Sequence, residues 1–428
     1  MYTRSTDKYR VAVIGGGASG MLFAGMLTSI SENCAVTVFE KSKAVLRKLA
    51  ITGKGRCNLT NDCAPEEIMK NVISNPRFLY GALNAFSPED VKALFKGLGV
   101  PLVTERGRRV FPASSKAYDI VDALKKYARR AEVRTSCPVF SLTRNGEGFT
   151  VESPRGKESF DCVLIATGGL SYKLTGSDGD GMRFADALGH SVVPCRASLV
   201  PIEARDKALC AEMMGLSLKN VALKIEGEGK KPLYEDFGEM LFTHFGLSGP
   251  MILSASAHIR DKDISSLTAY IDLKPALDEQ TLDARLVSDF KEMANKDYIN
   301  VLAGLLPSKM TEVFARMSKI DRHRKANSIT KEERRGILEL LKRFPVRLSR
   351  LRDINEAVIT AGGVSTKEIN PKTMESKIVG SLYFAGETID IDALTGGYNL
   401  QLAFSTAAAA ARAVAERAAE NTENEVYL

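Results

Sequence analysis

Three glycines near the start of the chain have the spacing of a turn that binds phosphate. A predicted strand, Val11–Ile14, leads into Gly15-Gly16-Gly17-Ala18-Ser19-Gly20, and a helix is expected from about Met21. In the pattern G-x-G-x-x-G the first glycine allows a tight turn, the second lets the backbone approach a pyrophosphate, and the third lets the helix pack close to the strand. The N–H groups of the helix N-terminus then face the phosphates. We therefore predict dinucleotide binding at this turn.

An acidic residue ends the second predicted strand, Val36–Phe39. Glu40 follows Gly20 by twenty residues, where a carboxylate accepts hydrogen bonds from ribose hydroxyls and disfavours a 2′-phosphate. Two alternatives are an incidental glycine-rich turn and a membrane span, since Val11–Ser31 carries no charge. The glycine run and the lack of a flanking targeting pattern argue against the span.

Further polar residues with flexible backbone follow this strand. The sequence after Glu40 places Lys48, Arg56 and Asn58 around Gly53 and Gly55. We interpret it as a loop around a phosphate or a polar ring edge, with an ordinary surface loop as the alternative. Later, the predicted buried strand from Asp161 ends in Thr167-Gly168-Gly169, a tip expected to face the nucleotide.

A second polar segment lies near the C-terminus. Gly386-Glu387, Asp390 and Asp392 precede the turn at Gly396-Gly397, which opens an alanine-rich helix. A helix N-terminus at that point would stabilise a developing negative charge. The strand–G-x-G-x-x-G–helix unit does not recur, so a separate nicotinamide-binding domain is not expected.

Composition limits the class of protein. At 428 residues, with 44% hydrophobic and 26% charged residues, the chain should form two or three globular domains. Seven scattered cysteines without a CxxC pattern, together with four histidines, argue against a metal site, and unpatterned cysteines suit a reducing cytoplasm. We therefore expect no metal, no secretion signal and a cytoplasmic location.

The positive charge is unevenly distributed. The net charge is +7, and Lys319–Arg352 alone holds twelve Lys/Arg against four Asp/Glu. A solvated helix face is the plain interpretation; docking of a phosphorylated substrate, nicotinamide cofactor, nucleic acid or acidic protein is the alternative. Nucleic acid is disfavoured because no aromatic residues interleave the charges. Arg106, Arg108 and Arg109 are interpreted as exposed charge on a hairpin around Gly107, with substrate contact as the alternative.

The remaining periodicity predicts the order of elements. Helices are expected over 64–100 and 117–130, then a meander of strands at 132–135, 139–143 and 149–152. Short alternating runs predict β-structure from residue 191 to about 277, and helical periodicity follows from 278 to 352. Strand-like runs return at 357–364 and 381–387.

Several motifs in order resemble one protein family. ITGKGRCNLTN, ATGGLSY, TGSDGDG, THFGLSGP, ITAGGV and LYFAGETIDIDALTGGYNLQ, with the glycine turn and Glu40-Lys41, resemble the bacterial BaiN-like, or aminoacetone-oxidase-type, FAD-binding flavoproteins. The resemblance spans residues 11 to about 412. Where members of that family often show Gly-Gly-Gly-Arg-Cys-Asn, this chain has Lys54 between Gly53 and Gly55.

The resemblance implies an α/β fold in which a Rossmann-like domain binds FAD without a covalent bond. This domain would be discontinuous, residues 1–190 and 355–428, with an inserted domain 191–354 that is β-rich to about 277 and helical from about 278. The implied cofactor-binding residues are Gly15, Gly17, Ala18, Ser19, Gly20, Glu40, Lys41, Lys48, Gly53, Gly55, Arg56, Cys57, Asn58, Thr60, Val133, Thr167, Gly168, Gly386, Glu387, Asp390, Gly397, Tyr398, Asn399 and Leu400.

The chemistry expected of such a protein is hydride transfer between FAD and a small organic substrate. His244, Tyr398 and Cys57 are the candidate catalytic residues, although each could equally be a structural group. The first hypothesis is an NADH- or NADPH-dependent reductase of an activated C=C or C=O bond. The alternatives are an O₂-dependent oxidase of an amine, amino ketone or hydroxy compound, and a flavin-containing module that binds nucleic acid or protein. A membrane partner is not expected, and the oligomeric state stays open.

Overall fold

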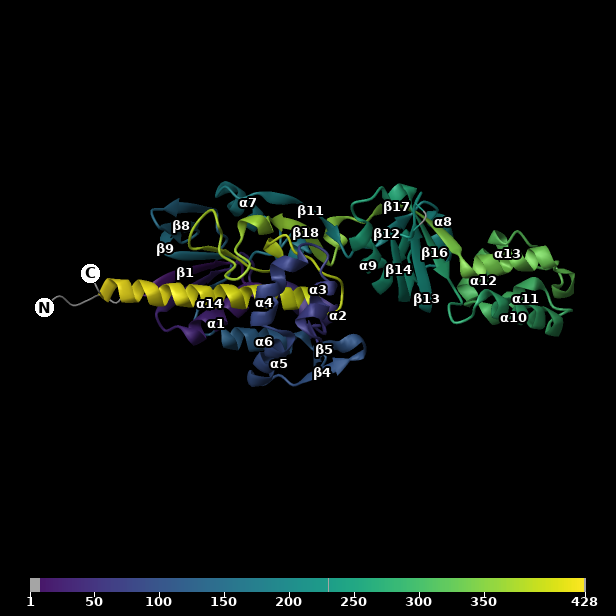
Figure 1. The fold of residues 1–428 in the computed structure, drawn as a ribbon, viewed down its shortest axis with the longest axis horizontal. Coiled ribbons are helices and arrows are strands. Elements are labelled where there is room, and N and C mark those ends of the chain that lie inside the picture. The colour runs from purple at the N-terminus through teal and green to yellow at the C-terminus, as the bar shows by residue number, and fades with distance from the viewer. Residues whose placement is uncertain (1–7, 230, 427–428) are drawn as a thin grey trace. The chain divides into compact units, whose positions relative to one another are not determined.

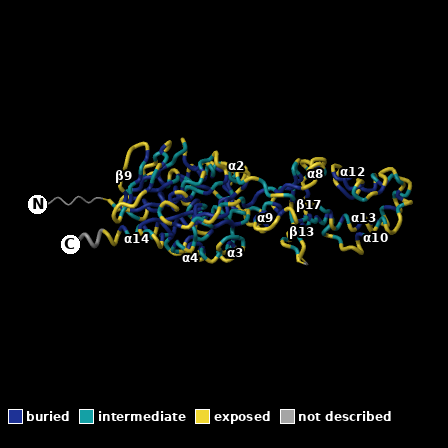
Figure 2. The backbone as a smooth tube through the Cα atoms, turned by 90° about the horizontal axis from the view of Figure 1, so that it is seen from above, coloured by how far each residue is buried: buried dark blue, intermediate teal, exposed yellow. Residues whose placement is uncertain are grey.

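The computed structural model describes residues 8–229 and 231–426 and divides into two compact units (Figure 1). Unit 1 comprises Met1–Ala197 and Ala357–Leu428, and unit 2 comprises Ser198–Glu356. Each unit has its own apolar core, and the buried backbone is dark blue in Figure 2. The predicted fold class, a discontinuous Rossmann-like α/β domain with an inserted β-rich domain that carries helices, is confirmed.

Unit 1 is built on a parallel sheet with the strand order β19-β10-β1-β2-β6. Its strands are β1 Tyr9–Ile14, β2 Cys34–Phe39, β6 Glu132–Arg134, β10 Cys162–Ile165 and β19 Leu382–Phe384. The central strands are apolar runs, as expected where helices cover both faces of a sheet. Helices α1, Ala18–Ile30, and α14, Tyr398–Val426, pack against each other, so the two ends of unit 1 share one core (Figure 1).

The prediction for β6 was wrong in one respect. We expected 132–135 to begin a meander, but β6 pairs in parallel with β2, through Val38 and Val133 among others. The meander consists instead of β7 Ser141–Asn145, β8 Gly148–Ser153 and an unpredicted β9 Gly156–Phe160. A strand of three residues has too little pattern to reveal its distant partner.

The remaining elements of unit 1 surround the sheet. A small antiparallel sheet joins β3 Thr60–Asn61, β5 Arg109–Pro112 and β4 Leu102–Glu105, and β11 Val192–Ser198 pairs with β18 Ile359–Val364. The helices are α2 Arg47–Gly55, α3 Pro65–Lys70, α4 Tyr80–Ala85, α5 Pro88–Gly97, α6 Ala117–Tyr127 and α7 Asp180–Ala187. Short 3₁₀ turns lie at Pro76–Leu79, Arg106–Arg108, Lys173–Thr175, Thr366–Glu368 and Gly386–Thr388. The loop that we predicted after Glu40, around Gly53 and Gly55, therefore contains helix α2, whose regular turn is broken at Thr52–Lys54.

Unit 2 contains a closed barrel with the strand order β12-β15-β14-β13-β16-β17. The strands are β12 Ile202–Ala204, β13 Ser217–Glu226, β14 Tyr234–Phe242, β15 Gly246–Ser248, β16 Thr268–Asp272 and β17 Phe344–Leu351. The helices are α8 Lys207–Glu212, α9 Pro250–Ile259, α10 Glu279–Glu292, α11 Tyr298–Leu305, α12 Ser308–Met317 and α13 Lys331–Lys342.

The prediction of continuous helix to the end of the insert was wrong, because β17 closes the barrel between β16 and β12. Phe344, Val346 and Leu348 alternate with less buried residues and point into the core. Where β17 meets β12, the buried carboxylate of Glu203 accepts hydrogen bonds from the guanidinium groups of Arg350, at 2.9 Å, and Arg352, at 2.6 Å.

Candidate functional site

The glycine turn leaves space in front of helix α1. A Cβ atom on Gly15 would lie 2.4 Å from the carbonyl oxygen of Ala166, and one on Gly20 would lie 2.0 Å from that of Gly15. A Cβ on Gly17 would meet nothing closer than 3.9 Å. Gly17 is the N-cap residue of α1 and has no side chain to cap it, and Ala18 and Ser19 lie in the first turn. The N–H groups there are therefore open to an anion, which is the fit that a pyrophosphate requires.

Glu40 is held beside this turn by backbone donors. Its Oε2 accepts the N–H of Gly16 at 3.0 Å and its Oε1 accepts that of Ser42 at 2.7 Å. The Glu40 N–H donates to the carbonyl of Arg134, which puts Val133 and the end of β6 next to the same corner. This arrangement fits a ribose contact by the carboxylate.

Lys41, by contrast, forms ion pairs with two carboxylates of the protein. Its Nζ pairs with Asp178 and, at 2.9 Å, with Asp180 at the start of α7. Both hydrogen bonds raise the pKa of Lys41 against the opposing effect of burial, which is the largest single influence. Lys41 therefore ties the end of β2 to the loop before α7.

Two motifs that lie far apart in the sequence meet in one junction. Thr60 Oγ1 lies 2.5 Å from Gln401 Oε1, and Asn61 Nδ2 donates to the carbonyl of Gly396 at 3.0 Å. A Cβ on Gly397 would lie 2.3 Å from the Thr60 carbonyl oxygen and 2.9 Å from Asn58 Oδ1. The strand β3 and the start of α14 are thus in direct contact.

Asn58 supplies an independent sign of a ligand at this junction. Among the described residues, its Oδ1 is the one buried side-chain polar atom that has no hydrogen-bond partner. A buried polar atom without a partner costs about 1–3 kcal/mol. The edge of a flavin ring carries both N–H and C=O groups, so it could satisfy the Asn58 amide in either orientation. The residues present therefore fit FAD.

The segment before Asn58 has an unusual backbone. Gly53, Lys54, Gly55 and Cys57 all have positive φ angles, between 58° and 84°. Burial raises the pKa of the fully buried Cys57 thiol to about 12, so this group stays protonated at neutral pH and is disfavoured as a nucleophile. The Arg56 guanidinium pairs with Glu105 and lies 4.3 Å from the centre of the Phe111 ring, which directs it to the β4–β5 hairpin.

Lys48 and Glu387 form an internal polar network. Lys48 Nζ lies 2.5 Å from Glu387 Oε2 and donates to Ser171 Oγ at 2.8 Å. Glu387 Oε1 accepts Ser171 Oγ and the N–H of Thr360, both at 2.8 Å. Sequence reasoning missed Ser171 and Thr360, although both lie within motifs that it singled out.

Other predicted ligands also contact protein groups. Thr167 Oγ1 accepts the N–H of Gly181 at 3.1 Å, and Gly168 accepts a hydrogen bond from Thr388 Oγ1. The N–H of Gly386 donates to Thr406 Oγ1. Asp390 accepts the N–H of Gly362 and an Asn75 amide, while the Asn399 amide bonds both backbone groups of Ala393. Leu400 packs against the core of unit 1.

The three candidate catalytic residues do not form one cluster within a unit. Cys57 and Tyr398 belong to unit 1, whereas His244 lies in the turn between β14 and β15 of unit 2. His244 is exposed and contacts Phe245 edge to face. Tyr398 is half-buried at the start of α14, and burial raises the pKa of its hydroxyl.

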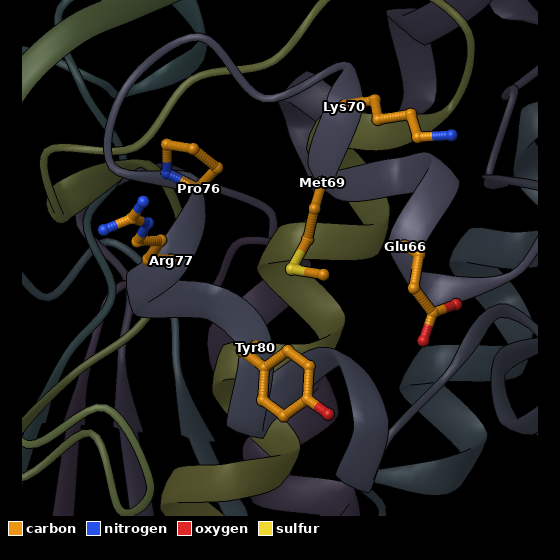
Figure 3. A pocket seen from close by; sticks show the side chains of 6 residues that line it. All are labelled: Glu66, Met69, Lys70, Pro76, Arg77 and Tyr80. Atoms are coloured by element: carbon orange, nitrogen blue, oxygen red, sulfur yellow. The ribbon is translucent and has the colours of Figure 1, made fainter.

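A shallow cavity of about 590 Å³ lies elsewhere on unit 1 (Figure 3). Met69, Tyr80 and Arg77 are among its lining residues, on α3, the 3₁₀ turn and α4. None of the predicted cofactor residues lines it, so it is distinct from the glycine turn and the junction. No helix in the described part of the chain is long and apolar enough to cross a membrane.

Comparisons with known proteins identify a family and several relatives. The family model for the HI0933-like protein Rossmann domain matches residues 9–413. A 3-dehydro-bile acid delta(4,6)-reductase of Clostridium scindens is 28% identical, over 95% of this chain and 99% of that protein. Ribosomal RNA dihydrouridine synthases of Haemophilus influenzae and Escherichia coli are 30% and 29% identical, each over 95% of this chain and 98% of the relative.

Two solved structures match the chain at low identity and with TM-scores below 0.5. A 3-ketosteroid delta1-dehydrogenase of Sterolibacterium denitrificans is 12% identical with a TM-score of 0.49, and the match covers 96% of this chain and 100% of that one. A quinol fumarate reductase of Escherichia coli is 15% identical with a TM-score of 0.49, covering 96% and 70%.

Proposed function

The chain belongs to the HI0933-like Rossmann-domain family and is an FAD-dependent oxidoreductase, and we propose that it reduces a carbon–carbon double bond conjugated to a carbonyl group. The observation that carries this proposal is the agreement of two kinds of relative along nearly the whole chain. One is named as a bile-acid delta(4,6)-reductase and the other as a dihydrouridine synthase. Both names describe the addition of two hydrogens to such a bond, because uracil also conjugates its ring double bond to a carbonyl.

We propose the uracil ring of an RNA as the acceptor. Two of the three relatives described act, by name, on ribosomal RNA, and one of them is 30% identical to this chain. A polycyclic enone is the second candidate, favoured by the bile-acid reductase. In either case a hydride adds to the carbon β to the carbonyl and a proton to the carbon α to it.

The residues of unit 1 have separate tasks in this proposal. FAD bound in this unit would supply the hydride, with NADH or NADPH as the source of its two electrons. The turn from Gly15 to Gly20 would hold the pyrophosphate, and Glu40 would hold the ribose. Asn58 and the backbone at Gly397 would hold the ring edge. The half-buried Tyr398 hydroxyl at the start of α14 is our candidate proton donor: a tyrosine carries its proton at neutral pH, and the burial that raises its pKa makes it a weaker acid than a free tyrosine.

Anaerobic stopped-flow measurement tests the reductant and the acceptor in turn. We expect NADH or NADPH to bleach the flavin absorbance of the purified protein. Mixing the reduced protein with a ribosomal RNA fragment should restore the absorbance and leave dihydrouridine, detected by mass spectrometry of the digested RNA. Reoxidation by a 3-oxo-4-ene steroid but not by RNA would select the enone as acceptor. Failure of both acceptors would refute the proposed reaction.

A further inference from the structure

The two arginine- and lysine-rich segments of the chain differ in how their charges are satisfied. In Lys319–Arg352, nine of the twelve cations form ion pairs with carboxylates of unit 2. The paired cations are Arg322, Arg324, Lys325, Arg334, Arg335, Lys342, Arg343, Arg350 and Arg352. This segment therefore has little charge left for a partner, despite its composition.

The β4–β5 hairpin of unit 1 shows the opposite. Arg106, Arg108 and Arg109 at its tip are exposed, and so are Lys54 and Lys116 beside it. Within the described ranges, 8–229 and 231–426, none of these five side chains forms an ion pair with a carboxylate. We call these five residues the hairpin surface.

Three carboxylates around the hairpin surface already have cationic partners, and a fourth, Asp119, accepts a hydrogen bond from the Ser114 hydroxyl. Glu105, the one acidic residue of the hairpin, pairs with Arg56, and this bond lowers its pKa, with a smaller influence from Arg109. Asp62 pairs with Lys92, and Glu67 pairs with Lys70. The hairpin surface thus keeps a net positive charge.

Packing brings the three segments of the hairpin surface together. The Phe111 ring lies 5.8 Å from the Arg109 guanidinium, and a Cβ on Gly53, the neighbour of Lys54, would lie 3.8 Å from the same ring. Arg56, which covers that ring, also donates to Ser115 next to Lys116 at 3.3 Å. The Phe111 ring, directly or through Arg56, therefore links the three backbone segments that carry Lys54, Arg109 and Lys116.

Two of these cations occupy a backbone conformation that glycine prefers. Lys54 and Arg108 both have a φ of 58°, next to Gly53, Gly55 and Gly107, which also have positive φ. A left-handed conformation costs a residue with a Cβ about 1–2 kcal/mol. Such strain often persists where a side chain is needed for function.

The tip of the hairpin is fixed to the predicted flavin edge. Asn61 Nδ2 donates to the carbonyl of Gly107 and to that of Gly396, each at 3.0 Å. One amide thus joins the turn between Arg106 and Arg108 to the turn that precedes Tyr398. An anionic chain bound to the hairpin surface would therefore lie next to the predicted flavin edge, where we expect the reaction to take place.

We infer that the hairpin surface binds the phosphodiester backbone of the RNA that carries the acceptor uracil. This inference rests on the proposed function. Five unpaired cations from three segments match a chain with one negative charge per nucleotide, and phosphate contacts of this kind position a nucleic acid without reading its sequence. The flexible bases remain free to enter the site.

A charge-matched pair of variants tests the inference. The test variant is Arg106→Gln/Arg108→Asn/Arg109→Gln, where asparagine tolerates the left-handed backbone. The control, Lys319→Gln/Lys331→Gln/Arg335→Gln, removes the same charge from unit 2. Affinity for a fluorescent ribosomal RNA fragment is measured from low to high salt, together with FAD content, thermal melting and NAD(P)H-dependent reduction of a 3-oxo-4-ene steroid.

We expect the test variant to bind RNA about 10- to 100-fold more weakly than wild type. Each phosphate contact to a single strand contributes about 0.7 to the slope of log K against log salt concentration, so the loss of three cations should reduce that slope by about two. The control should stay close to wild type, and FAD content and melting should be unchanged in both. RNA affinity of the test variant equal to that of the control would overturn the inference and leave the proposed reaction standing. A raised KM for NADPH with unchanged RNA affinity would overturn it in favour of the nicotinamide phosphates. If the wild-type chain binds no RNA, both the RNA acceptor and the inference fail, while steroid reduction would still support the reaction class.

Discussion

Substitution of Gly397 by alanine should open the junction between β3 and α14. The new Cβ would lie 2.3 Å from the Thr60 carbonyl oxygen, whereas ordinary contacts begin near 3.4 Å. Thr60 cannot retreat easily, because β3 is paired with β5 and its side chain is bonded to Gln401. Gly99 offers a matched control: its φ of 86° resembles the 95° of Gly397, but nothing lies within 4 Å of its Cβ position.

The two substitutions share one cost and differ in another. Both place alanine in the left-handed region, at about 1–2 kcal/mol. Gly397→Ala adds overpacking of about 1–3 kcal/mol. If the junction opens to relieve that strain, FAD binding weakens by the same amount, or about 5- to 150-fold at 1.4 kcal/mol per tenfold.

Titration of the apoprotein with FAD, followed by flavin fluorescence, measures this effect. We expect Gly99→Ala to keep the wild-type Kd and to lose only thermal stability. Gly397→Ala should lose both. A Kd for Gly397→Ala within twofold of that for Gly99→Ala would refute the assignment of the junction to the flavin edge.

Three further substitutions test other parts of the structure. Hydrogen bonds from Arg350 first, and then from Lys207 and Arg352, lower the pKa of buried Glu203 from 4.5 to about 2. The ionised carboxylate therefore contributes about 3 kcal/mol to the free energy of unfolding above pH 4.5, and this contribution is lost as the pH falls towards 2. Glu203→Gln should therefore lower the melting temperature at pH 7 and flatten its dependence on pH between 4.5 and 2; an unchanged profile would contradict this account. Cys57→Ala should keep FAD and turnover, since a thiol with a pKa of about 12 supplies no nucleophile; loss of turnover in a folded, FAD-loaded variant would show the reverse. Lys48→Met leaves the Glu387 carboxylate without its cation and should destabilise unit 1 by about 1–3 kcal/mol in urea unfolding, with Glu387→Gln added to Lys48→Met recovering part of the loss; additive effects would argue against a coupled pair.

Local patterns were sufficient to predict the start of the fold. The strand, glycine turn and helix over residues 11–30 follow from a short apolar run and the steric needs of Gly15 and Gly20. The helices expected within 64–100 and over 117–130 are equally local, and the structure contains α5 and α6 in those ranges. Where a feature depends on neighbours in the sequence, the sequence predicts it.

Features that depend on distant partners were harder to predict. The contact of Thr60 with Gln401 spans 341 residues, and only the resemblance to a family brought these two segments together. Lys48, Glu387 and Asp390 were predicted as ligands, and this stays a prediction; the structure adds that all three bond to protein groups from distant segments, which a charged residue type does not reveal.

The density of charge in the sequence did not indicate which cations are paired within the protein. The sequence drew attention to the density of cations in 319–352 and treated the hairpin arginines as exposed charge. In the structure the dense segment is largely paired within unit 2, and the smaller hairpin cluster is not. Counting cations cannot identify which ones have carboxylates within reach, since those carboxylates come from elsewhere in the chain.

The junction between β3 and α14 also has a consequence for biosynthesis. A ribosome that adds about 5–20 residues each second needs roughly 20–70 seconds to pass from Thr60 to Gln401, 341 positions later. During that time the emerging chain contains the complete glycine turn and strand β3, but it still lacks the start of α14, which forms the other side of the predicted flavin edge. The barrel unit, which is synthesised in between, can fold first. FAD is therefore enclosed after translation of the last helix begins, and nascent or C-terminally truncated chains should emerge colourless.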